Sequence, residues 1–164
     1  MGDEANEYYV RKMKDRLREY REAEKEIENQ TERLERLVSK MEGIGAKEIT
    51  DMPRSPSPPT DRISSFMNQK IEIEEMIAED AAALQEERRA IEQILRHLRS
   101  ANERAVIRFR YFGGLDWYEV TNAMFGGRED YLDKEDSYLK QVFRIHRNAI
   151  LNMAIYTAEK AGHS

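Results

Sequence analysis

The chain has 164 residues, a formal net charge of −5 and no cysteine, so disulfides and thiolate-held zinc or iron–sulfur centres are excluded. Charged residues make up 36% of the chain and hydrophobic residues 40%, against roughly 25% and 45–50% in an average globular protein. This composition argues against one large core extending throughout the chain. The longest apolar stretch, residues 149–158, is interrupted by Asn152 and is shorter than the ~20 residues that a membrane span needs. The N-terminus is acidic and lacks the apolar region of a signal peptide. We therefore expect a soluble, cytoplasmic, helix-rich protein with no membrane contact.

Charge is unevenly distributed along the sequence. Residues 100–164 carry 9 basic and 9 acidic side chains, whereas the acidic excess lies in residues 1–99. Within residues 137–160 there are 4 basic groups and 1 acidic group. A protein that binds nucleic acid by bulk charge needs many more cations. Any nucleic-acid contact is therefore expected to come from a local patch.

The first predicted element is a heptad helix over residues 1–42. Apolar residues recur at alternating steps of three and four, which is the pattern of a coiled-coil seam. The seam positions are Val10, Met13, Leu17, Tyr20, Glu24, Ile27, Thr31, Leu34, Val38 and Met41. Two of them, Glu24 and Thr31, are polar. We expect a helix from about residue 5 to 42 that ends at Gly43 and Gly45.

Residues 43–60 form a predicted linker that holds all 4 prolines of the chain. A connector between two helices is favoured over a proline-rich ligand for a signalling domain. A second long amphipathic helix is predicted over residues 61–100, capped by Thr60 or Asp61. The two long helices can pair as an antiparallel hairpin or with another copy of the chain, because neither is stable in water with its apolar stripe exposed.

Residues 101–160 are predicted to form a small trihelical domain at the end of this coiled-coil stalk, so that the whole chain is all-α. The first helix covers residues 102–112 and ends at two glycines. Asp116 and Glu119 have the spacing of a capping box, which begins a second helix that ends at Gly126. An acidic segment follows up to Asp136, and the third helix runs to about Lys160. We expect Trp117 in the core and the tyrosines and acidic residues of 128–138 at the surface.

The third helix of this domain separates into two faces at 100° per residue. One face is predicted to be core and comprises Leu139, Val142, Phe143, His146, Ala149, Ile150 and Met153. The other carries the side-chain types that contact phosphates and base edges: Lys140, Gln141, Arg144, Arg147 and Asn148. Leu151 and Ile155 lie on this polar side, where the stalk or a second chain would bury them.

No residue pattern points to catalysis, a cofactor or a bound metal. His146 lies among apolar residues, which favours a packed, hydrogen-bonded histidine over a metal ligand or a base. The Gly43-Ile44-Gly45 segment lacks the third glycine and the preceding strand of a phosphate-binding loop. We therefore expect a protein that is not an enzyme.

Two segments carry a resemblance to a known family. The run Arg104-Ala-Val-Ile-Arg-Phe-Arg-Tyr-Phe-Gly-Gly-Leu-Asp-Trp-Tyr-Glu-Val120 resembles region 4 of sigma-70-type factors. The run Tyr138-Leu-Lys-Gln-Val-Phe-Arg-Ile-His-Arg-Asn-Ala-Ile150 is similar to the recognition helix of that group. With the N-terminal stalk, the chain resembles phage and prophage transcriptional regulators of the ArpU/RinA type. The resemblance covers roughly residues 101–157. One departure is the connection of about ten residues, 126–135, where sigma region 4 has a tight turn.

The resemblance implies a helix-turn-helix domain that reads double-stranded DNA and acts on transcription. Lys140, Gln141 and Arg144 would contact bases or phosphates, and Arg147 and Asn148 the backbone. The stalk would form a homo-oligomer, expected to be a dimer, or contact RNA polymerase. Two alternatives stay open: a structural or adaptor protein that acts through protein–protein contacts, and a phage DNA-packaging recognition subunit.

Overall fold

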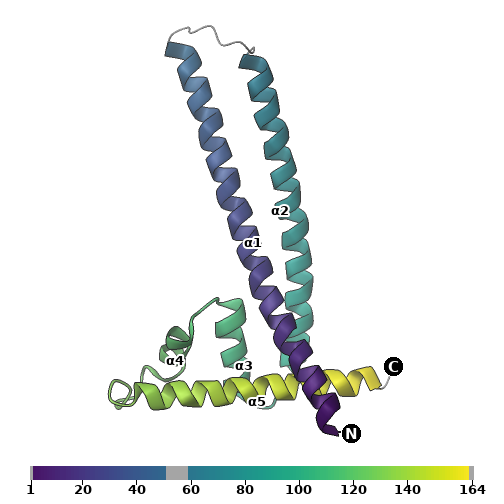
Figure 1. Ribbon diagram of the computed structural model, residues 1–164. Helices are drawn as coiled ribbons and strands as arrows, with labels where there is room; N and C mark the ends of the chain where they lie inside the picture. Colours follow the sequence, from purple (N-terminus) through teal and green to yellow (C-terminus); the bar gives the residue numbers. More distant parts are fainter. Residues whose placement is uncertain (1, 51–58, 163–164) are drawn as a thin grey trace. The chain divides into compact units, whose positions relative to one another are not determined.

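The computed structural model describes residues 2–50 and 59–162, and it confirms the predicted all-α fold. The helices are α1 (Gly2–Thr50), α2 (Pro59–Leu95), α3 (Ala101–Ile107), the π-helical segment η1 (Arg108–Phe112), α4 (Trp117–Phe125) and α5 (Glu135–Gly162) (Figure 1). The chain forms two compact units. Unit 1 comprises residues 1–22 and 86–164, and unit 2 comprises residues 23–85. Residues 2–22 of α1 and 86–95 of α2, which we call the stalk base, are therefore part of the same unit as α3, η1, α4 and α5.

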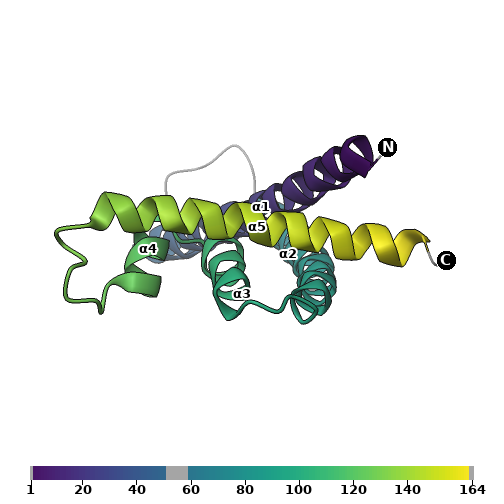
Figure 2. The same ribbon diagram turned by 90° about the horizontal axis from the view of Figure 1, so that it is seen from below.

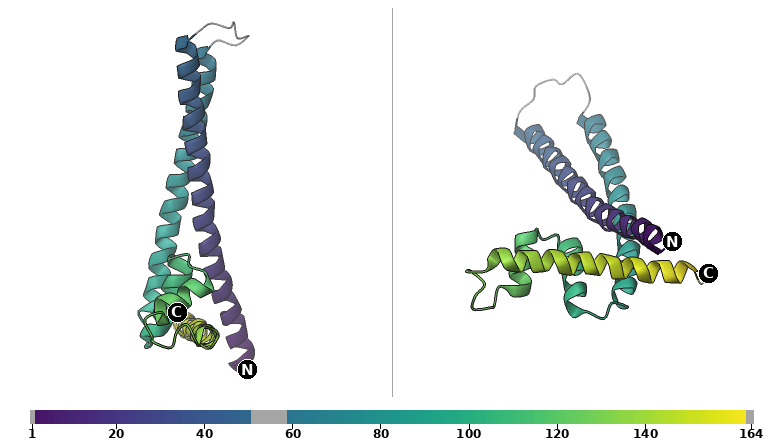
Figure 3. Two further views of the ribbon diagram at one scale, coloured as in Figure 1. Left: turned by 90° about the vertical axis from the view of Figure 1, so that its left-hand side faces the viewer. Right: turned by 60° about the horizontal axis from the view of Figure 1, so that its bottom comes forward.

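Unit 2 contains the central part of α1 and the first part of α2, which run antiparallel to each other (Figures 1 and 3). Leu37 on α1 and Ile73 on α2 are buried. Leu37 lies outside the predicted seam, whereas the seam residues Ile27 and Leu34 are half-buried and Thr31 is exposed. The heptad pattern therefore marks the side of α1 that faces α2 only in part, and the two helices pair within one chain.

The predicted end of the first helix was wrong. The α1 helix continues through Gly43 and Gly45 to Thr50, and the exposed Gly43 has open space where a Cβ would be. A glycine costs a helix about 1 kcal/mol but keeps its backbone donor, unlike proline, so a glycine alone does not end a helix. Most of the proline-rich part of the predicted linker, residues 51–58, lies outside the described residues.

The second long helix also differs from its predicted bounds at both ends. It begins at Pro59, one residue before the predicted capping position Thr60, and ends at Leu95 rather than near residue 100. Proline suits the first turn of a helix because the amide hydrogen that it lacks has no intrahelical acceptor there. Residues 96–100 form a turn that leads into α3.

In unit 1 the base of α1 packs on the end of α2. Met13, Leu17 and Tyr20 of α1 are buried, as are Ile91, Ile94 and Leu95 of α2. The ring of Tyr20 meets Phe112 of η1 edge-on, with 5.2 Å between ring centroids. Arg16 and Glu87 form an ion pair across the two long helices. These contacts join the stalk base to the C-terminal helices.

The C-terminal helices share a core in which α3 and α4 pack against the long helix α5 (Figures 1 and 2). One valine of each of these helices is completely buried: Val106, Val120 and Val142. Phe125, Tyr131 and Tyr138 extend the cluster towards the start of α5. This arrangement gives the three helices the trihelical packing that the sequence predicts.

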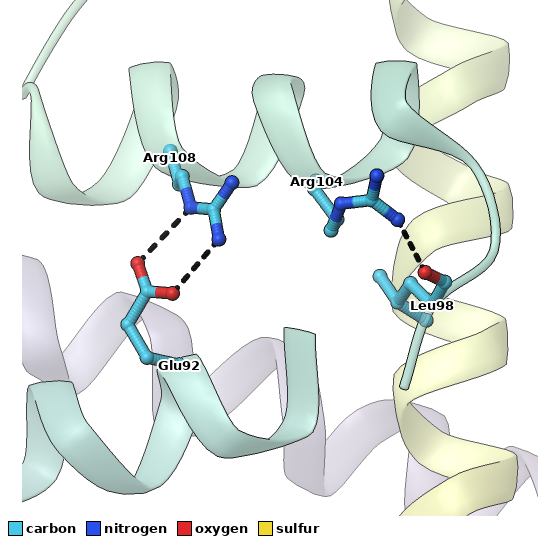
Figure 4. Close-up of polar contacts among 4 residues, drawn as sticks. All are labelled: Glu92, Leu98, Arg104 and Arg108. Carbon is cyan, nitrogen blue, oxygen red and sulfur yellow. Dashed lines mark hydrogen bonds and ion pairs between the residues drawn. The ribbon is translucent and has the colours of Figure 1, made fainter. Parts of the chain in front are cut away.

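Polar contacts fix the turn between α2 and α3 (Figure 4). Arg108 donates from Nε and Nη2 to the two carboxylate oxygens of Glu92, at 3.1 Å and 2.9 Å. Arg104 donates to the carbonyl oxygen of Leu98, and Ser100 accepts a hydrogen bond from the amide of Glu103 as the N-cap of α3. Because the paired charges join α2 to η1, the orientation of the C-terminal helices within unit 1 is tied to the stalk base.

The turn between η1 and α4 has two features of backbone geometry. The amide of Gly113 donates to the carbonyl of Arg108 at 2.8 Å, closing a π-type turn. Gly114 has a φ of 67°, where glycine carries no steric penalty. The predicted capping box is confirmed, since the Asp116 carboxylate accepts from the Glu119 amide and the Glu119 side chain accepts from the Asp116 amide.

Candidate nucleic-acid interface

The long helix α5 has one buried and one exposed side. The buried side carries Tyr138, Val142, Ala149, Ile150, Met153 and Ala154. The exposed side carries four of the five predicted site residues, Lys140, Arg144, Arg147 and Asn148, whereas Gln141 is half-buried at its edge. Within the described part of the chain, no salt bridge involves Lys140, Arg144 or Arg147. The structure therefore leaves these cations accessible to an external anion.

His146 is packed and hydrogen-bonded, which confirms the interpretation from sequence. Its Nε2 lies 2.8 Å from the hydroxyl oxygen of Tyr111. The imidazole meets the edge of the Trp117 ring, with 4.7 Å between centroids. Burial, followed by repulsion from Arg110 and Lys14, lowers the pKa of His146 to about 4. The ring is therefore neutral at pH 7. Its contacts with Tyr111 and Trp117 help to hold α5 in place.

Trp117 packs partly into the core, as predicted, and supports a cation that sequence reasoning missed. The guanidinium of Arg110 lies 4.5 Å from the Trp117 ring centroid and donates to the carbonyl oxygen of Leu115 at 3.0 Å. Burial and then repulsion from Arg21 lower the pKa of Arg110. The sequence separation of Arg110 and Trp117 does not predict this contact. The π-helical turn at η1 changes the direction of the side chains that follow it, so α-helical spacing does not apply across it.

Phe143 departs from the predicted core face of α5, and the apolar residues predicted on the polar side, Leu151 and Ile155, are only partly covered. Phe143 packs against Trp117 with 5.2 Å between centroids but keeps 38% of its surface exposed. Leu151 is also 38% exposed, and it lines a surface hollow together with Val10, Arg11 and Lys14 of α1. Ile155 is half-buried and lines a second hollow together with residues of the α2–α3 turn. The stalk base therefore covers these apolar side chains only in part.

The prediction that the tyrosines of residues 128–138 lie at the surface was wrong. Tyr131 and Tyr138 are 7% and 8% exposed, and Tyr138 stacks on Phe125 with 5.0 Å between centroids. The hydroxyl of Tyr138 donates to Asp130, which also pairs with Lys134. Buried aromatic rings thus hold the α4–α5 connection against the core. The acidic composition of the segment gave no indication of this burial.

The acidic side chains of this connection have two kinds of environment. Glu129 and Asp133 are exposed as predicted. The hydrogen bond from Tyr138 holds the pKa of Asp130 below its usual value, and the same bond raises the pKa of Tyr138. The connection between α4 and α5 is a structured series of turns rather than a continuous helix.

Among residues 2–50 and 59–162, no cluster of three or more histidine, cysteine or acidic side chains is arranged to hold a metal ion. No helix in those same ranges has the length and apolar character to cross a membrane. Comparisons with protein-family models, curated proteins and solved structures found no match to this chain.

Proposed function

We propose that this chain is a sequence-specific DNA-binding transcription regulator of phage or prophage type. In this proposal the N-terminal half of α5 enters the major groove. Lys140, Gln141 and Arg144 contact bases or phosphates, and Arg147 and Asn148 contact the backbone. The stalk forms a dimer or contacts RNA polymerase. The proposal is supported above all by the exposed cationic and amide face of α5, which lies opposite its buried side.

The chemistry of this face matches a DNA reader. Arginine and lysine bind phosphates and guanine edges, while asparagine and glutamine can pair with adenine. Lys140, Arg144 and Arg147 follow one another at steps of four and three residues, so their side chains share one side of the helix. The trihelical packing of α3, α4 and α5 supplies the rigid support that a helix needs when it enters a groove.

Direct binding measurements test this proposal. The full chain would be titrated, at several salt concentrations, with a labelled duplex from the region upstream of its own gene and with a scrambled duplex of equal length. We expect the upstream duplex to bind at least tenfold more tightly at moderate salt, in keeping with a specific reader. Equal binding to both duplexes would contradict sequence-specific recognition.

Charge-matched variants test the contact face itself. The variant Lys140→Ala/Arg144→Ala is expected to lose most of the preference for the upstream duplex. The control Arg89→Ala/Arg96→Ala removes the same charge from exposed positions near the end of α2 and in the turn that follows it, and it is expected to keep that preference. Unchanged affinity in the α5 variant would remove the assignment of this face.

A structural or adaptor role is the second candidate, and one observation favours it. Ile63, Met67 and Ile71 lie one helical turn apart on α2, and 39–47% of each side chain is exposed. Such a stripe can bind a partner helix. Light scattering with and without DNA separates the two functions, because an adaptor would assemble with a protein partner and show no DNA-dependent change. A ring-sized oligomer would instead favour a packaging recognition subunit.

A further inference from the structure

Residues 11–21 of α1 carry a basic stripe, which we define as Arg11, Lys14, Arg18 and Arg21 and which Asp3 and Glu7 precede on the same side of the helix. These residues are spaced at i, i+3, i+7 and i+10, so they occupy one side of the helix. From Arg11 to Arg21 this side holds no acidic residue, and Asp15 at its edge lies 3.5 Å from Arg18. The basic stripe is therefore a concentrated positive surface on an element whose overall composition is acidic.

Packing within unit 1 places the basic stripe beside the α5 surface. Met13, Leu17 and Tyr20, next to the stripe on α1, are buried, and Tyr20 contacts Phe112 of η1. Arg11 and Lys14 line one hollow together with Leu151 of α5 and the acidic Asp3 and Glu7 of α1. Figures 1 and 3 show the first turns of α1 crossing beside the C-terminal half of α5. The stripe thus begins near α5 and continues towards η1.

The electrostatic surroundings agree with this placement. After burial, the main causes that lower the pKa of His146 are Arg110 on η1 and Lys14 on α1. Burial raises the pKa of Tyr111, and the nearby charges of Arg110, Arg21 and Arg18 oppose that rise. Cations from α1 and η1 therefore surround the same Tyr111–His146 pair that supports α5.

Of the three cations on the α5 face, Arg147 lies nearest to Leu151 along the helix. It follows His146 on α5 by one residue, about 100° around the helix, and is exposed. Leu151, one turn further along α5, borders the hollow that contains Arg11 and Lys14. Arg147 is therefore one helical turn from the α5 side chain that borders the basic stripe.

We infer that the basic stripe of α1 is a second DNA-contacting surface, which binds the phosphate backbone of the duplex while α5 reads its sequence. The inference rests on the proposed function and assigns a role to residues that the helix-turn-helix resemblance does not include. Backbone contacts carry no sequence information, and each adds to the salt dependence of binding. The stripe therefore contributes affinity and orientation, whereas α5 contributes discrimination.

The test measures the salt dependence of binding of the full chain to the upstream and scrambled duplexes. Lys14→Ala/Arg18→Ala replaces two exposed side chains of the stripe. We expect this variant to bind both duplexes about tenfold more weakly and to lower the slope of log K against log salt by about 1.8. The ratio of the two affinities should stay as in the unmodified chain. Thermal unfolding confirms that the variant is folded.

Two controls separate the inference from the proposed function. Arg89→Ala/Arg96→Ala removes equal charge from the end of α2 and the turn that follows it, and its slope should not change. Lys140→Ala/Arg144→Ala should lower the affinity ratio. If the stripe variant keeps its slope while the α5 variant loses discrimination, the inference is overturned and the proposed function stands. If the unmodified chain binds neither duplex, both are overturned. Binding of the stripe to anionic phosphatidylserine vesicles, with the DNA slope unchanged, would also overturn the inference.

Discussion

Tyr111 and His146 join η1 to α5 through a hydrogen bond of 2.8 Å between the tyrosine hydroxyl oxygen and Nε2 of the imidazole. The imidazole also meets the Trp117 ring edge-on, and the cations Arg110 and Lys14 are close enough to help lower its pKa. The neutral form of His146 is therefore part of what holds α5 against η1, and its protonation is coupled to stability.

The first prediction concerns pH. Burial lowers the pKa of His146 to about 4, whereas the ring in the unfolded chain has a pKa of about 6.5. Between these values the unfolded chain binds more protons, so the His146 contribution is present above pH ~6.5 and is lost as the pH falls towards 4. His146→Gln should remove up to about 3 kcal/mol of the difference in unfolding free energy between pH 4 and pH 7.

Urea unfolding at several pH values checks this prediction. Carboxylates also titrate in this range, so the informative quantity is the change in slope between the variant and the unmodified chain. His97→Gln is the control because its ring lies at the surface, stacked on Tyr156. A His146→Gln variant with an unchanged slope would show that His146 is not held in its neutral form.

The second prediction concerns the base of the stalk. Leu17 is completely buried where α1 joins unit 1, so Leu17→Ala should lower the free energy of unfolding by about 2–5 kcal/mol. Ile71→Ala removes an aliphatic side chain that is 47% exposed and should cost less than about 1 kcal/mol. Similar losses from the two variants, measured by urea unfolding, would contradict the packing of α1 on the C-terminal helices.

The third prediction concerns the ion pair of Figure 4. The hydrogen bond from Arg108 is the main cause that lowers the pKa of Glu92. Both side chains are partly exposed, so Glu92→Gln should cost only about 0.5–1 kcal/mol at pH 7. Because a lowered carboxyl pKa stabilises the fold above the ordinary value of 4.5, the cost should shrink as the pH falls below it. A cost that grows in acid would exclude this pair as its source.

The fourth prediction concerns the α4–α5 connection. Tyr131→Ala removes a buried ring that stacks on Tyr138 with 5.9 Å between centroids. The variant should be cut faster by trypsin at Arg128 and Lys134, because the connection loses its anchor. The neighbouring Leu132 is 86% exposed, so Leu132→Ala should be cut at the original rate. Equal cleavage rates for the two variants would argue that the aromatic stack does not order this segment.

The sequence pattern predicted the fold well wherever burial follows a regular period. The seam residues of α1, the capping box at Asp116 and the buried side of α5 are all visible in spacing, because one helix face makes one set of contacts. The π-turn at η1, the burial of Tyr131 and the helical Gly43 were not predictable in this way. Each depends on contacts or backbone energies that composition and period do not record.

The candidate site was predicted in part. The spacing of Lys140, Arg144 and Arg147 shows that they share a side, and the structure shows that this side is exposed. The proximity of the basic stripe to α5 depends on how α1 packs against η1, which involves residues far apart in the sequence. The helical spacing of the basic stripe is nevertheless visible in the sequence. The acidic excess of residues 1–48, taken as a whole, hides this local positive side.

The central claim, that the exposed face of α5 lies against DNA, can be tested by site-directed cleavage. The chain has no cysteine, so Ser137→Cys on α5 and Gln93→Cys on α2 each provide one attachment point for an iron chelate at an exposed position. With the upstream duplex bound, the chelate at residue 137 is expected to cut DNA within a few base pairs of one position, and the chelate at residue 93 to cut little. Cleavage from residue 93 without cleavage from residue 137 would contradict the account.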